Sequence, residues 1–384
     1  MTPSCDLVIV GAGSVGVPAA LACARSGLSV VVLDFRPSPG QGEHKKAIGG
    51  VRATHSEKGK VVVCTRSIQI FSSWLEETGD DILWAANGYS YPAYRENEEK
   101  TLKSAMDLQI KNGADVQWLT PEDYRLMVPG IRMEGLRGAI YSRGDGSASP
   151  LLFMTSVYRR AVEAGVRFRF NQRVTGFVMD KSRVSAVRTD QGTIGCGAIL
   201  NAAGAAAREV SLMAGVDIPV RPDCHEALVT EPVAPFMGPM VVDMRPVPGS
   251  RNFYFYQNRE GHVIACLTPD PPLWGTDSRS TSGFLPLISR RMIELMPMLA
   301  PLKIRRSWRG LYPMTPDGFP IFGKAPGLQN YFLSTGMCGQ GFMIGPGLGE
   351  TFHRLLSGGT LPEDEVVLSS FSPNRDFSGH ELFA

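Results

Sequence analysis

A glycine-rich segment near the start of the sequence has the spacing that dinucleotide-binding turns use. It reads GxGxxG over residues 11–16, follows the apolar run 7–10 and opens a helix-like segment at 17–26. Asp34 ends the next apolar run. Such a turn lets backbone N–H groups and a helix N-terminus hold a pyrophosphate, while the acidic residue accepts hydrogen bonds from ribose hydroxyls. The segment therefore predicts a dinucleotide site, without deciding between a flavin and a nicotinamide.

Two later segments favour a flavin. A predicted meander leads into an apolar strand that ends in the sequence Asn-Ala-Ala-Gly at 201–204, and a second glycine cluster at 336–342 directly precedes a predicted helix. The N-terminus of a helix carries partial positive charge. A reduced flavin carries negative charge around N1 and the C2 carbonyl, so a helix N-terminus beside the ring would stabilise the reduced state.

The order of the predicted elements indicates a nucleotide-binding domain assembled from separate parts of the chain. A βαβ unit at the start, a helix and meander in the middle and a strand–glycine–helix unit near the end are interrupted by two mainly strand-like excursions. This pattern predicts an α/β fold, α+β overall, with a nucleotide-binding domain assembled from three segments and a mainly β domain formed by the two excursions.

The polar segment after Ser369 is expected to be disordered or to dock on a partner. The expected boundaries are 1–84, 144–224 and 308–384 for the FAD-binding domain, and 85–143 and 225–307 for the substrate domain.

Composition narrows the class of protein. The chain of 384 residues has 39 basic and 37 acidic residues, so it lacks the excess of positive charge that is typical of nucleic-acid-binding proteins. The seven cysteines are scattered, and neither they nor the six histidines show metal-ligand spacing, so no metal is expected. The start of the sequence lacks the features of a signal peptide, and no apolar run is long enough to span a bilayer. We expect a cytoplasmic protein, with peripheral attachment to the inner face of the membrane left open.

With these motifs in hand, the chain resembles the D-amino-acid oxidase-like superfamily of FAD-dependent oxidoreductases over almost its whole length. The resemblance rests on residues 8–16, 199–205, 315–321 and 334–342. It implies a Rossmann-like FAD-binding domain with an inserted antiparallel β-sheet substrate domain. Within the superfamily it is most similar to the sarcosine and glycine oxidase branch and to the β subunits of multi-subunit proline, sarcosine and opine dehydrogenases. By resemblance, the FAD-binding residues are Gly11, Gly13, Ser14, Gly16, Asp34, Arg36, Ala47, Ile48, Val174, Gly204, Gly336, Gly339, Gln340, Gly341 and Phe342.

The resemblance also points to substrate-site residues. Arg52 matches an arginine that binds the substrate carboxylate, a task that suits the two parallel bonds of a guanidinium; a structural ion pair beside the flavin is the alternative. Tyr254 matches an active-site tyrosine, with ordinary sheet packing as its alternative, and His55 either faces the flavin or is solvated. Met343 stands where the family has a second, lysine ligand for the carboxylate, so the site is altered or the substrate is bulkier.

Two further departures bear on the cofactor and the oxidant. Some members of the family attach FAD through a cysteine shortly before the Thr-Pro-Asp motif, which lies here at 315–317. Residues 308–312 contain no cysteine, so non-covalent FAD is expected. Cys266 aligns loosely with the lysine that helps oxygen react in monomeric sarcosine oxidases, which favours a dehydrogenase. The electron acceptor is then oxygen, a quinone or another subunit.

The expected reaction is oxidation of the C–N bond of a small amino acid or secondary amine, by hydride transfer to flavin N5, followed by hydrolysis of the imine. One alternative is an FAD-dependent 2-hydroxy-acid dehydrogenase, which requires a base, His55 or His225. Another is a β-type subunit that is active only in a hetero-oligomer and carries a second flavin, FMN. Lys45 and Lys46 are then solvated, or hold the phosphate of that second nucleotide.

Overall fold

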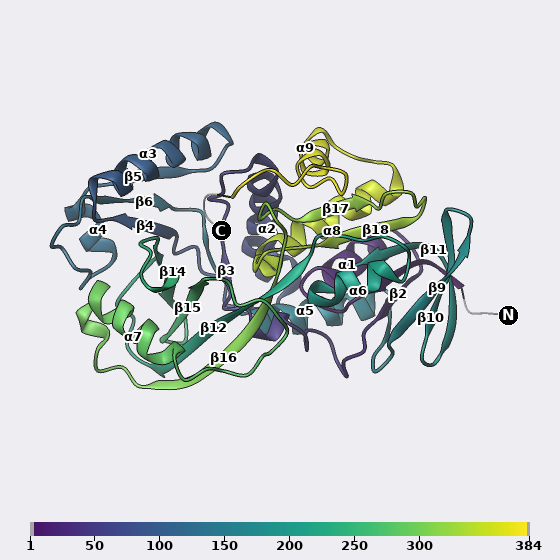
Figure 1. Cartoon of the computed structure of the whole chain (residues 1–384), viewed down its shortest axis with the longest axis horizontal. Helices are drawn as coiled ribbons and strands as arrows, with labels where there is room; N and C mark the ends of the chain where they lie inside the picture. The colour runs from purple at the N-terminus through teal and green to yellow at the C-terminus, as the bar shows by residue number, and fades with distance from the viewer. Residues whose placement is uncertain (1–3, 382–384) are drawn as a thin grey trace.

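The computed structural model describes residues 4–381 and contains two eight-stranded sheets that occupy opposite ends of the molecule (Figure 1). The first sheet has a parallel centre flanked by antiparallel strands. Leu7 and Ile9 pack into the core on one face, and Val8 and Val10 pack into the core on the other. Burial on both faces explains why this strand is a continuous apolar run. The path of the sheet is β17 (Ile321–Lys324), β18 (Tyr331–Thr335), β11 (Gly192–Asn201), β1 (Ser4–Val10), β2 (Val30–Leu33) and β8 (Arg167–Arg169), and β10 (Arg183–Thr189) and β9 (Val174–Asp180) extend it from β11.

Helices of this half pack unusually closely because of a row of glycines in α8 (Gly341–Ser357). A Cβ at Gly345 would lie 2.1 Å from the backbone oxygen of Ser14, and one at Gly349 would lie 2.9 Å from the backbone nitrogen of Ala19. Only glycine permits such an approach of two backbones. The α8 helix thus lies directly on the helix that follows the dinucleotide turn. The other helices here are α1 (Gly16–Arg25), α2 (Lys58–Thr78), α5 (Pro150–Glu163), α6 (Ala207–Leu212) and α9 (Pro362–Ser370), with short 3-10 turns η1 (His44–Lys46) and η2 (Gly204–Ala206).

The second sheet is antiparallel except where β13 and β4 run parallel. The helix α7 (Phe284–Leu295) packs its apolar side on one face of this sheet, with Phe253 and Phe255 among its neighbours in the core. The path is β16 (Ile304–Met314), β12 (Arg221–Pro232), β15 (His262–Asp270), β14 (Gly249–Gln257), β13 (Met240–Asp243), β4 (Tyr89–Ala93), β6 (Gly138–Ser142) and β5 (Val116–Leu119). Its edge carries α3 (Glu96–Lys111) and α4 (Pro121–Met127); η3 (Pro297–Leu299) follows α7, and β3 (Gly50–Val51) pairs with β7 (Gly146–Ser147) between the two halves.

The expected fold class is confirmed, since a parallel FAD-type sheet and a largely antiparallel second sheet are both present. The domain boundaries expected at 224/225 and 307/308 fall inside β12 and β16, which pair along nearly their whole length. The division into two domains stays a prediction. The apolar strand expected before the Asn-Ala-Ala-Gly sequence is the last part of β11, which ends at Asn201. None of the helices in residues 4–381 combines the length and apolar character that crossing a membrane requires.

The segment after Ser369 is neither disordered nor exposed along its whole length within the described residues, so this expectation requires correction. Arg375 forms an ion pair with Asp317 at 2.6 Å, and the side chain of Glu381 is buried. The segment packs on its own chain because these charges meet complementary groups there. Its polar composition gave no sign of this.

Candidate active site

The dinucleotide turn has a shape that only glycine allows at two of its positions. Gly11 has a φ of +110°, and a Cβ there would lie 2.4 Å from the backbone oxygen of Ala202. A Cβ at Gly16 would lie 1.9 Å from the backbone oxygen of Gly11. At Gly13, by contrast, a Cβ would meet no atom of the chain within 4 Å. The glycine at 13 is therefore explained by something outside the polypeptide, which fits the pyrophosphate of a dinucleotide.

Asp34 sits at the end of β2, as the sequence predicted, and organises the turn. Its carboxylate accepts hydrogen bonds from the backbone N–H groups of Ala12 and Arg36, both at 2.8 Å. Each carboxylate oxygen retains capacity for a further hydrogen bond, which suits ribose hydroxyls. Val174 begins β9 and packs in the same core as the β2 strand, and Gly204 has a φ of +56° in the turn after β11. These residues surround one end of the parallel sheet.

The second glycine cluster wraps the start of α8. Gly336 and Gly339 have positive φ angles, and a Cβ at Gly339 would lie 2.2 Å from the ring of Tyr312. The side-chain oxygen of Gln340 is buried and has no hydrogen-bond partner among the described residues. Gly341 is the first residue of α8, so the unpaired N–H groups of the helix start here. A buried acceptor and free donors at this point fit the polar edge of a flavin.

Phe342 has a different place from the other residues of this cluster. Its ring packs on Phe71 at 5.0 Å and on Phe153 at 5.9 Å between centroids, within the apolar core. Only the backbone of Phe342 is therefore available for contact with a cofactor. Ser14, at the dinucleotide turn, uses its hydroxyl in a 2.7 Å hydrogen bond with His44.

A cavity of about 350 Å³ lies where the two halves of the molecule meet. It brings together residues that the sequence selected from distant segments, among them Arg52, Tyr254, Gly339 and Met343. Its other polar and aromatic walls include Tyr89, Tyr91, Asp223, His225, Tyr312 and Gln340. Of these, the sequence did not single out Tyr89, Tyr91, Asp223 or Tyr312 as site residues.

Arg52 is the buried cation of this cavity. Its guanidinium donates a hydrogen bond to the backbone oxygen of Thr54, and its side chain is almost fully buried. Burial disfavours the charge, but the surrounding tyrosines and the carboxylates of Glu381 and Asp145 raise the pKa of Arg52 above its ordinary value. The guanidinium therefore remains charged in an enclosed site, where an anion is bound more strongly than in water.

Asp145 holds the loop that follows Arg52. Its carboxylate accepts hydrogen bonds from the backbone N–H of Ala53 at 2.7 Å and from the hydroxyl of Thr54 at 2.9 Å. Burial raises the pKa of this carboxyl to about 6, against the opposing effect of these donors and of Arg52. The sequence gave no signal for Asp145, which lies 92 residues from Ala53.

Tyr254 forms part of a buried polar cluster on the second sheet. Its hydroxyl lies 2.8 Å from that of Tyr312, and the thiol of Cys266 lies 3.8 Å from the Tyr312 hydroxyl. Burial raises the pKa of both tyrosines well above the ordinary value and also raises that of the thiol. All three groups are thus neutral, so the cluster supplies hydrogen bonds rather than charge.

His225 and Asp223 form a pair in the cavity wall. They are two residues apart on β12 and therefore share one face of the sheet. The Nε2 atom of His225 lies 3.0 Å from the Asp223 carboxylate, and its ring stacks on Tyr312 at 3.8 Å. Since the carboxylate accepts, Nε2 carries the hydrogen, and Nδ1 has no hydrogen-bond partner among the described residues. Nδ1 is therefore the ring nitrogen that is left as a hydrogen-bond acceptor.

His55 does not line this cavity. It is fully buried behind the Arg52 loop, where its Nδ1 lies 3.7 Å from the carboxylate of Glu381. Burial and the charge of Arg52 lower the pKa of His55 to about 3. Of the two histidines that the sequence offered as bases, the structure therefore places His225, not His55, in the cavity wall. No group of three or more potential metal ligands is found within residues 4–381.

Comparison with known proteins agrees with this arrangement. Residues 6–355 match the family of FAD-dependent oxidoreductases designated DAO. The chain belongs to this family. It is 27% identical to a sarcosine oxidase subunit beta from Arthrobacter sp over 98% of this chain and 92% of that protein. The solved L-proline dehydrogenase from P. horikoshii superposes with a TM-score of 0.90 at 29% identity, covering 98% of both chains. Glycine oxidase from Geobacillus kaustophilus superposes with a TM-score of 0.87 at 24% identity, covering 97% and 99%.

As a member of the DAO family, the protein is an enzyme whose cofactor is FAD and whose class of reaction is the oxidation of amino acids or amines. The resemblance seen in the sequence is thus confirmed. The donors and glycines described above are the residues of this chain that fit the cofactor.

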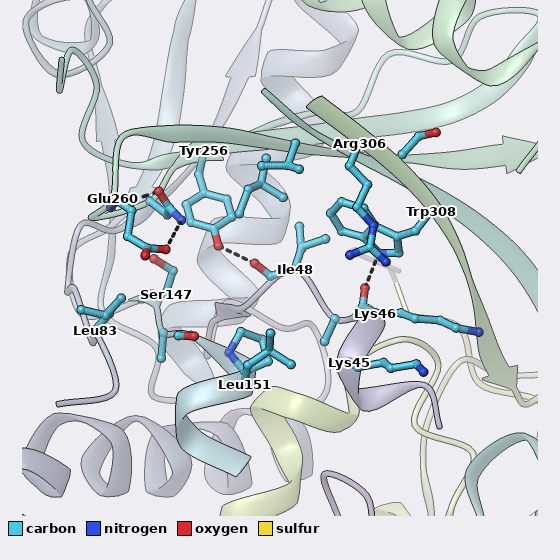
Figure 2. Close-up of a pocket in the computed structure, with 18 of the residues that line it drawn as sticks. Lys45, Lys46, Ile48, Leu83, Ser147, Leu151, Tyr256, Glu260, Arg306 and Trp308 are labelled. Carbon is cyan, nitrogen blue, oxygen red and sulfur yellow. Dashed lines mark hydrogen bonds between the residues drawn. The ribbon is translucent and has the colours of Figure 1, made fainter. Parts of the chain in front are cut away.

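A second cavity of about 480 Å³ is lined by residues 45–48, among others (Figure 2). The indole N–H of Trp308 donates a 2.8 Å hydrogen bond to the backbone oxygen of Lys46, and the hydroxyl of Tyr256 donates to that of Ile48. Ala47 and Ile48, which the sequence selected as FAD-binding, form part of this wall. The charged side chains around the cavity are Lys45, Lys46, Arg259, Arg306 and Arg309, with Glu260 as the acidic member.

The buried histidines should make this DAO-family protein sensitive to mild acid. His44 accepts from Ser14 and donates to the backbone oxygen of Pro150 at 2.7 Å, and burial lowers its pKa to about 4. A folded-state pKa below the unfolded value of about 6.5 gives stability that is present above pH 6.5 and is lost as the pH falls toward 4. For His44 the loss amounts to about 3 kcal/mol.

Thermal unfolding of the FAD-loaded protein between pH 7.5 and pH 4.5 measures this effect. We expect the melting temperature to fall steeply below pH 6.5 and to fall less steeply in His44→Gln. His380→Gln, at an exposed position, is the control. Identical pH dependence in His44→Gln and the wild type would contradict the assignment.

Proposed function

We propose that the protein oxidises the C–N bond of a small amino acid or secondary amine that carries a carboxylate. The observation that carries this proposal is the buried, charged Arg52 in the wall of a cavity formed by both halves of the molecule. A guanidinium binds a carboxylate through two parallel hydrogen bonds. The similarity to proline dehydrogenase and to a sarcosine oxidase subunit, both named for amino acids with a secondary amine, supports the same substrate class.

The residues of the chain position the substrate and exclude water. Arg52 binds the carboxylate, and Met343, on the first turn of α8, replaces a second cation with an apolar surface. The neutral hydroxyls of Tyr254 and Tyr312 offer hydrogen bonds without adding charge. Bound FAD supplies the hydride acceptor, and the imine product hydrolyses after release. The protein's share of the catalysis is therefore orientation and electrostatics.

The Asp223–His225 pair gives the cavity a proton acceptor. An amino acid in solution carries an ammonium group, which must lose a proton before hydride can leave the adjacent carbon. Nδ1 of His225 is the acceptor that this proposal assigns to that proton. The same pair would serve a 2-hydroxy acid, whose hydroxyl also needs a base, so it supports that alternative as the second candidate.

A dehydrogenase is favoured over an oxidase. Cys266, which aligns loosely with an oxygen-activating lysine, is buried, and its thiol is held neutral by burial. The side chains of fixed positive charge among the described residues of the cavity wall are Arg52 and Arg251. With Arg52 engaged by a carboxylate, little positive charge is left to stabilise reduced oxygen.

Anaerobic reduction of the purified protein tests this function. We expect the yellow flavin band to be bleached by proline, by sarcosine or by an opine, and to return only slowly when air is admitted. Bleaching by 2-hydroxy acids alone would shift the assignment to the second candidate. A yellow protein that no amine or hydroxy acid reduces would contradict an independent enzyme and favour a subunit that needs its partners.

We also infer that the second cavity receives a phosphate-bearing cofactor, with FMN as the candidate, in a hetero-oligomeric form of the enzyme. Five cationic side chains and an indole around about 480 Å³ suit a phosphate and a flat ring. The similar sarcosine oxidase chain is itself named a subunit, which supports assembly with other chains. The fluorescence of FMN should therefore be quenched when FMN binds to the protein. Riboflavin, which lacks the phosphate, should bind at least tenfold more weakly in the same titration. Equal binding of both would exclude a phosphate site.

A further inference from the structure

The last described residues of the chain return to the loops of the cavity. Beyond α9, Arg375 binds Asp317 through hydrogen bonds of 2.6 and 3.0 Å. The backbone N–H of Glu381 donates to the backbone oxygen of the same Asp317 at 3.3 Å. Asp317 follows Thr315, which lines the cavity. The segment 375–381 is thus fastened to one cavity loop at both of its ends.

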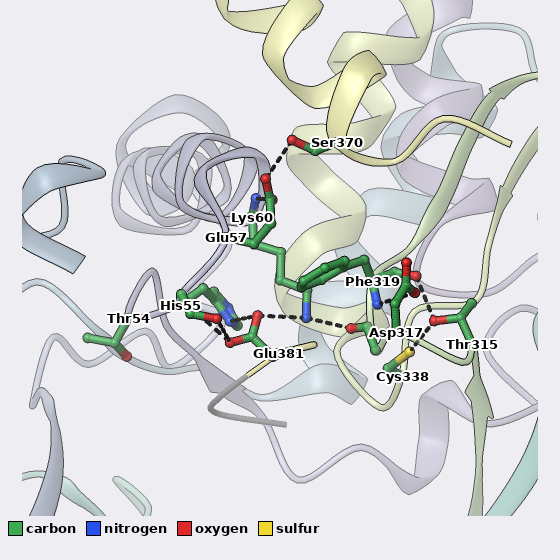
Figure 3. Close-up of polar contacts among 12 residues, drawn as sticks. Thr54, His55, Glu57, Lys60, Thr315, Asp317, Phe319, Cys338, Ser370 and Glu381 are labelled. Carbon is green, nitrogen blue, oxygen red and sulfur yellow. Dashed lines mark hydrogen bonds and ion pairs between the residues drawn. The ribbon is translucent and has the colours of Figure 1, made fainter. Parts of the chain in front are cut away.

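The side chain of Glu381 reaches a second cavity loop. It is 1% exposed, and its carboxylate accepts hydrogen bonds from the backbone N–H of Ser56 at 3.2 Å and from the Ser56 hydroxyl at 2.7 Å. It also forms an ion pair with the fully buried Lys60 at 3.1 Å (Figure 3). Burial opposes ionisation, but the charges of Lys60 and Arg52, together with the contact to His55, hold the pKa of Glu381 well below its ordinary value. The carboxylate is therefore charged.

Two buried carboxylates consequently hold the two ends of the loop that follows Arg52. Asp145 binds Ala53 and Thr54 at the near end, and Glu381 binds Ser56 at the far end. The guanidinium of Arg52 donates to the backbone oxygen of Thr54, which lies between these two attachments. The direction of the guanidinium thus depends on the shape of a loop that is fixed from both sides.

We propose that Glu381 is a positioning residue for Arg52, and that the C-terminal segment holds the Arg52 loop in the shape that presents the guanidinium to a substrate carboxylate. The proposal rests on the proposed function in that it takes Arg52 as the carboxylate ligand. Glu381 itself does not line the cavity. It acts through Ser56 and the loop, over 325 residues of sequence.

Whether removal of Glu381 weakens or strengthens anion binding distinguishes a positioning role from a simple charge effect. Removal of a nearby carboxylate raises the positive potential at Arg52, so a purely electrostatic role predicts tighter binding of an anion. A positioning role predicts weaker binding, because the guanidinium loses its fixed direction. Glu381→Ala removes both the charge and the hydrogen bonds, whereas Glu381→Gln keeps an oxygen that accepts from Ser56.

The first measurement is binding of two unreactive probes, acetate and acetamide, followed by perturbation of the oxidised flavin spectrum in the FAD-loaded protein. For Glu381→Ala we expect the dissociation constant for acetate to rise at least about tenfold and that for acetamide to change less than about twofold. Glu381→Gln should retain acetate binding close to that of the wild type. Glu365→Ala, at an exposed position on α9, is the matched control. Unchanged or tighter acetate binding in Glu381→Ala would overturn the proposal.

The second measurement is hydrogen–deuterium exchange of the peptide that contains residues 52–57, which needs neither ligand nor activity. We expect faster exchange in Glu381→Ala and wild-type protection in Glu381→Gln; unchanged exchange in the alanine variant overturns the positioning role. If Glu381→Ala does not fold, Ser56→Ala, which removes one of the two donors, takes its place with a smaller effect of the same sign. Acetate that binds equally to the wild type and to Arg52→Gln would instead overturn the proposed function, while the exchange result still decides whether Glu381 fixes the loop.

Discussion

Replacing Arg52 with glutamine should lower kcat/KM for an amino-acid substrate by about 2–4 kcal/mol of transition-state free energy, which is a factor of roughly 30 to 1000. The guanidinium is buried beside Asp145 and Glu381, so its loss removes the partner of the substrate carboxylate inside an enclosed site. The glutamine side chain fills most of the same space but offers no charge. FAD content should remain that of the wild type.

The amide of the same amino acid provides the internal control. It lacks the negative charge, so Arg52→Gln should affect its oxidation several-fold less than that of the acid. Arg251→Gln is the matched variant, because Arg251 lines the same cavity but is exposed to solvent. Steady-state kinetics with both substrates decide the matter. An equal loss for acid and amide would mean that Arg52 supports the loop rather than binding the carboxylate.

The nucleotide-binding half could be predicted from the sequence because its signals are local. The turn at 11–16, the strand before it and Asp34 after it lie within one βαβ unit, and their spacing alone fixes their geometry. The hydrogen bond from Ala12 to Asp34, across 22 residues, is the longest link that this motif needs.

The substrate site could be predicted only in part, because its walls come from segments that meet through tertiary pairing. Arg52 and Tyr254 emerged by resemblance, yet Tyr312 reaches Tyr254 only because β16 and β14 lie in one sheet. Asp223 carried a usable signal: it lies two residues before His225 on a strand, hence on the same face. His55 was offered together with His225, and nothing in the sequence distinguished a buried histidine behind the loop from one in the cavity.

The C-terminal segment was misjudged for a physical reason. A polar, charged stretch at the end of a chain is usually solvated, and Glu381 has no neighbour in sequence that marks it as buried. Its partners Ser56 and Lys60 are more than 300 residues away, at the start of α2. Buried charges of this kind are fixed by long-range complementarity, which a local pattern does not contain.

Replacing Gly13 with alanine should give a folded protein that has lost most of its FAD affinity, on the order of 100-fold. The added methyl group would meet no atom of the chain within 4 Å, and the backbone at this position is not left-handed, so the fold itself has no reason to change. Gly11 and Gly16 have no such free space, since a Cβ at either position would overlap the backbone. The methyl group at position 13 would enter only the space that we assign to the pyrophosphate.

The ratio of flavin to protein absorbance after purification, and titration of the apoprotein with FAD, measure the loss directly. Gly283→Ala, directly before α7, is the matched control, because its methyl group also meets no atom of the chain within 4 Å and it lies beside the second sheet. The melting temperature of the apoprotein should be the same in both variants and the wild type. Full FAD occupancy in Gly13→Ala would mean that the phosphates bind elsewhere. A loss of FAD together with a lower melting temperature of the apoprotein would instead show that position 13 serves the fold, contrary to the open space around it.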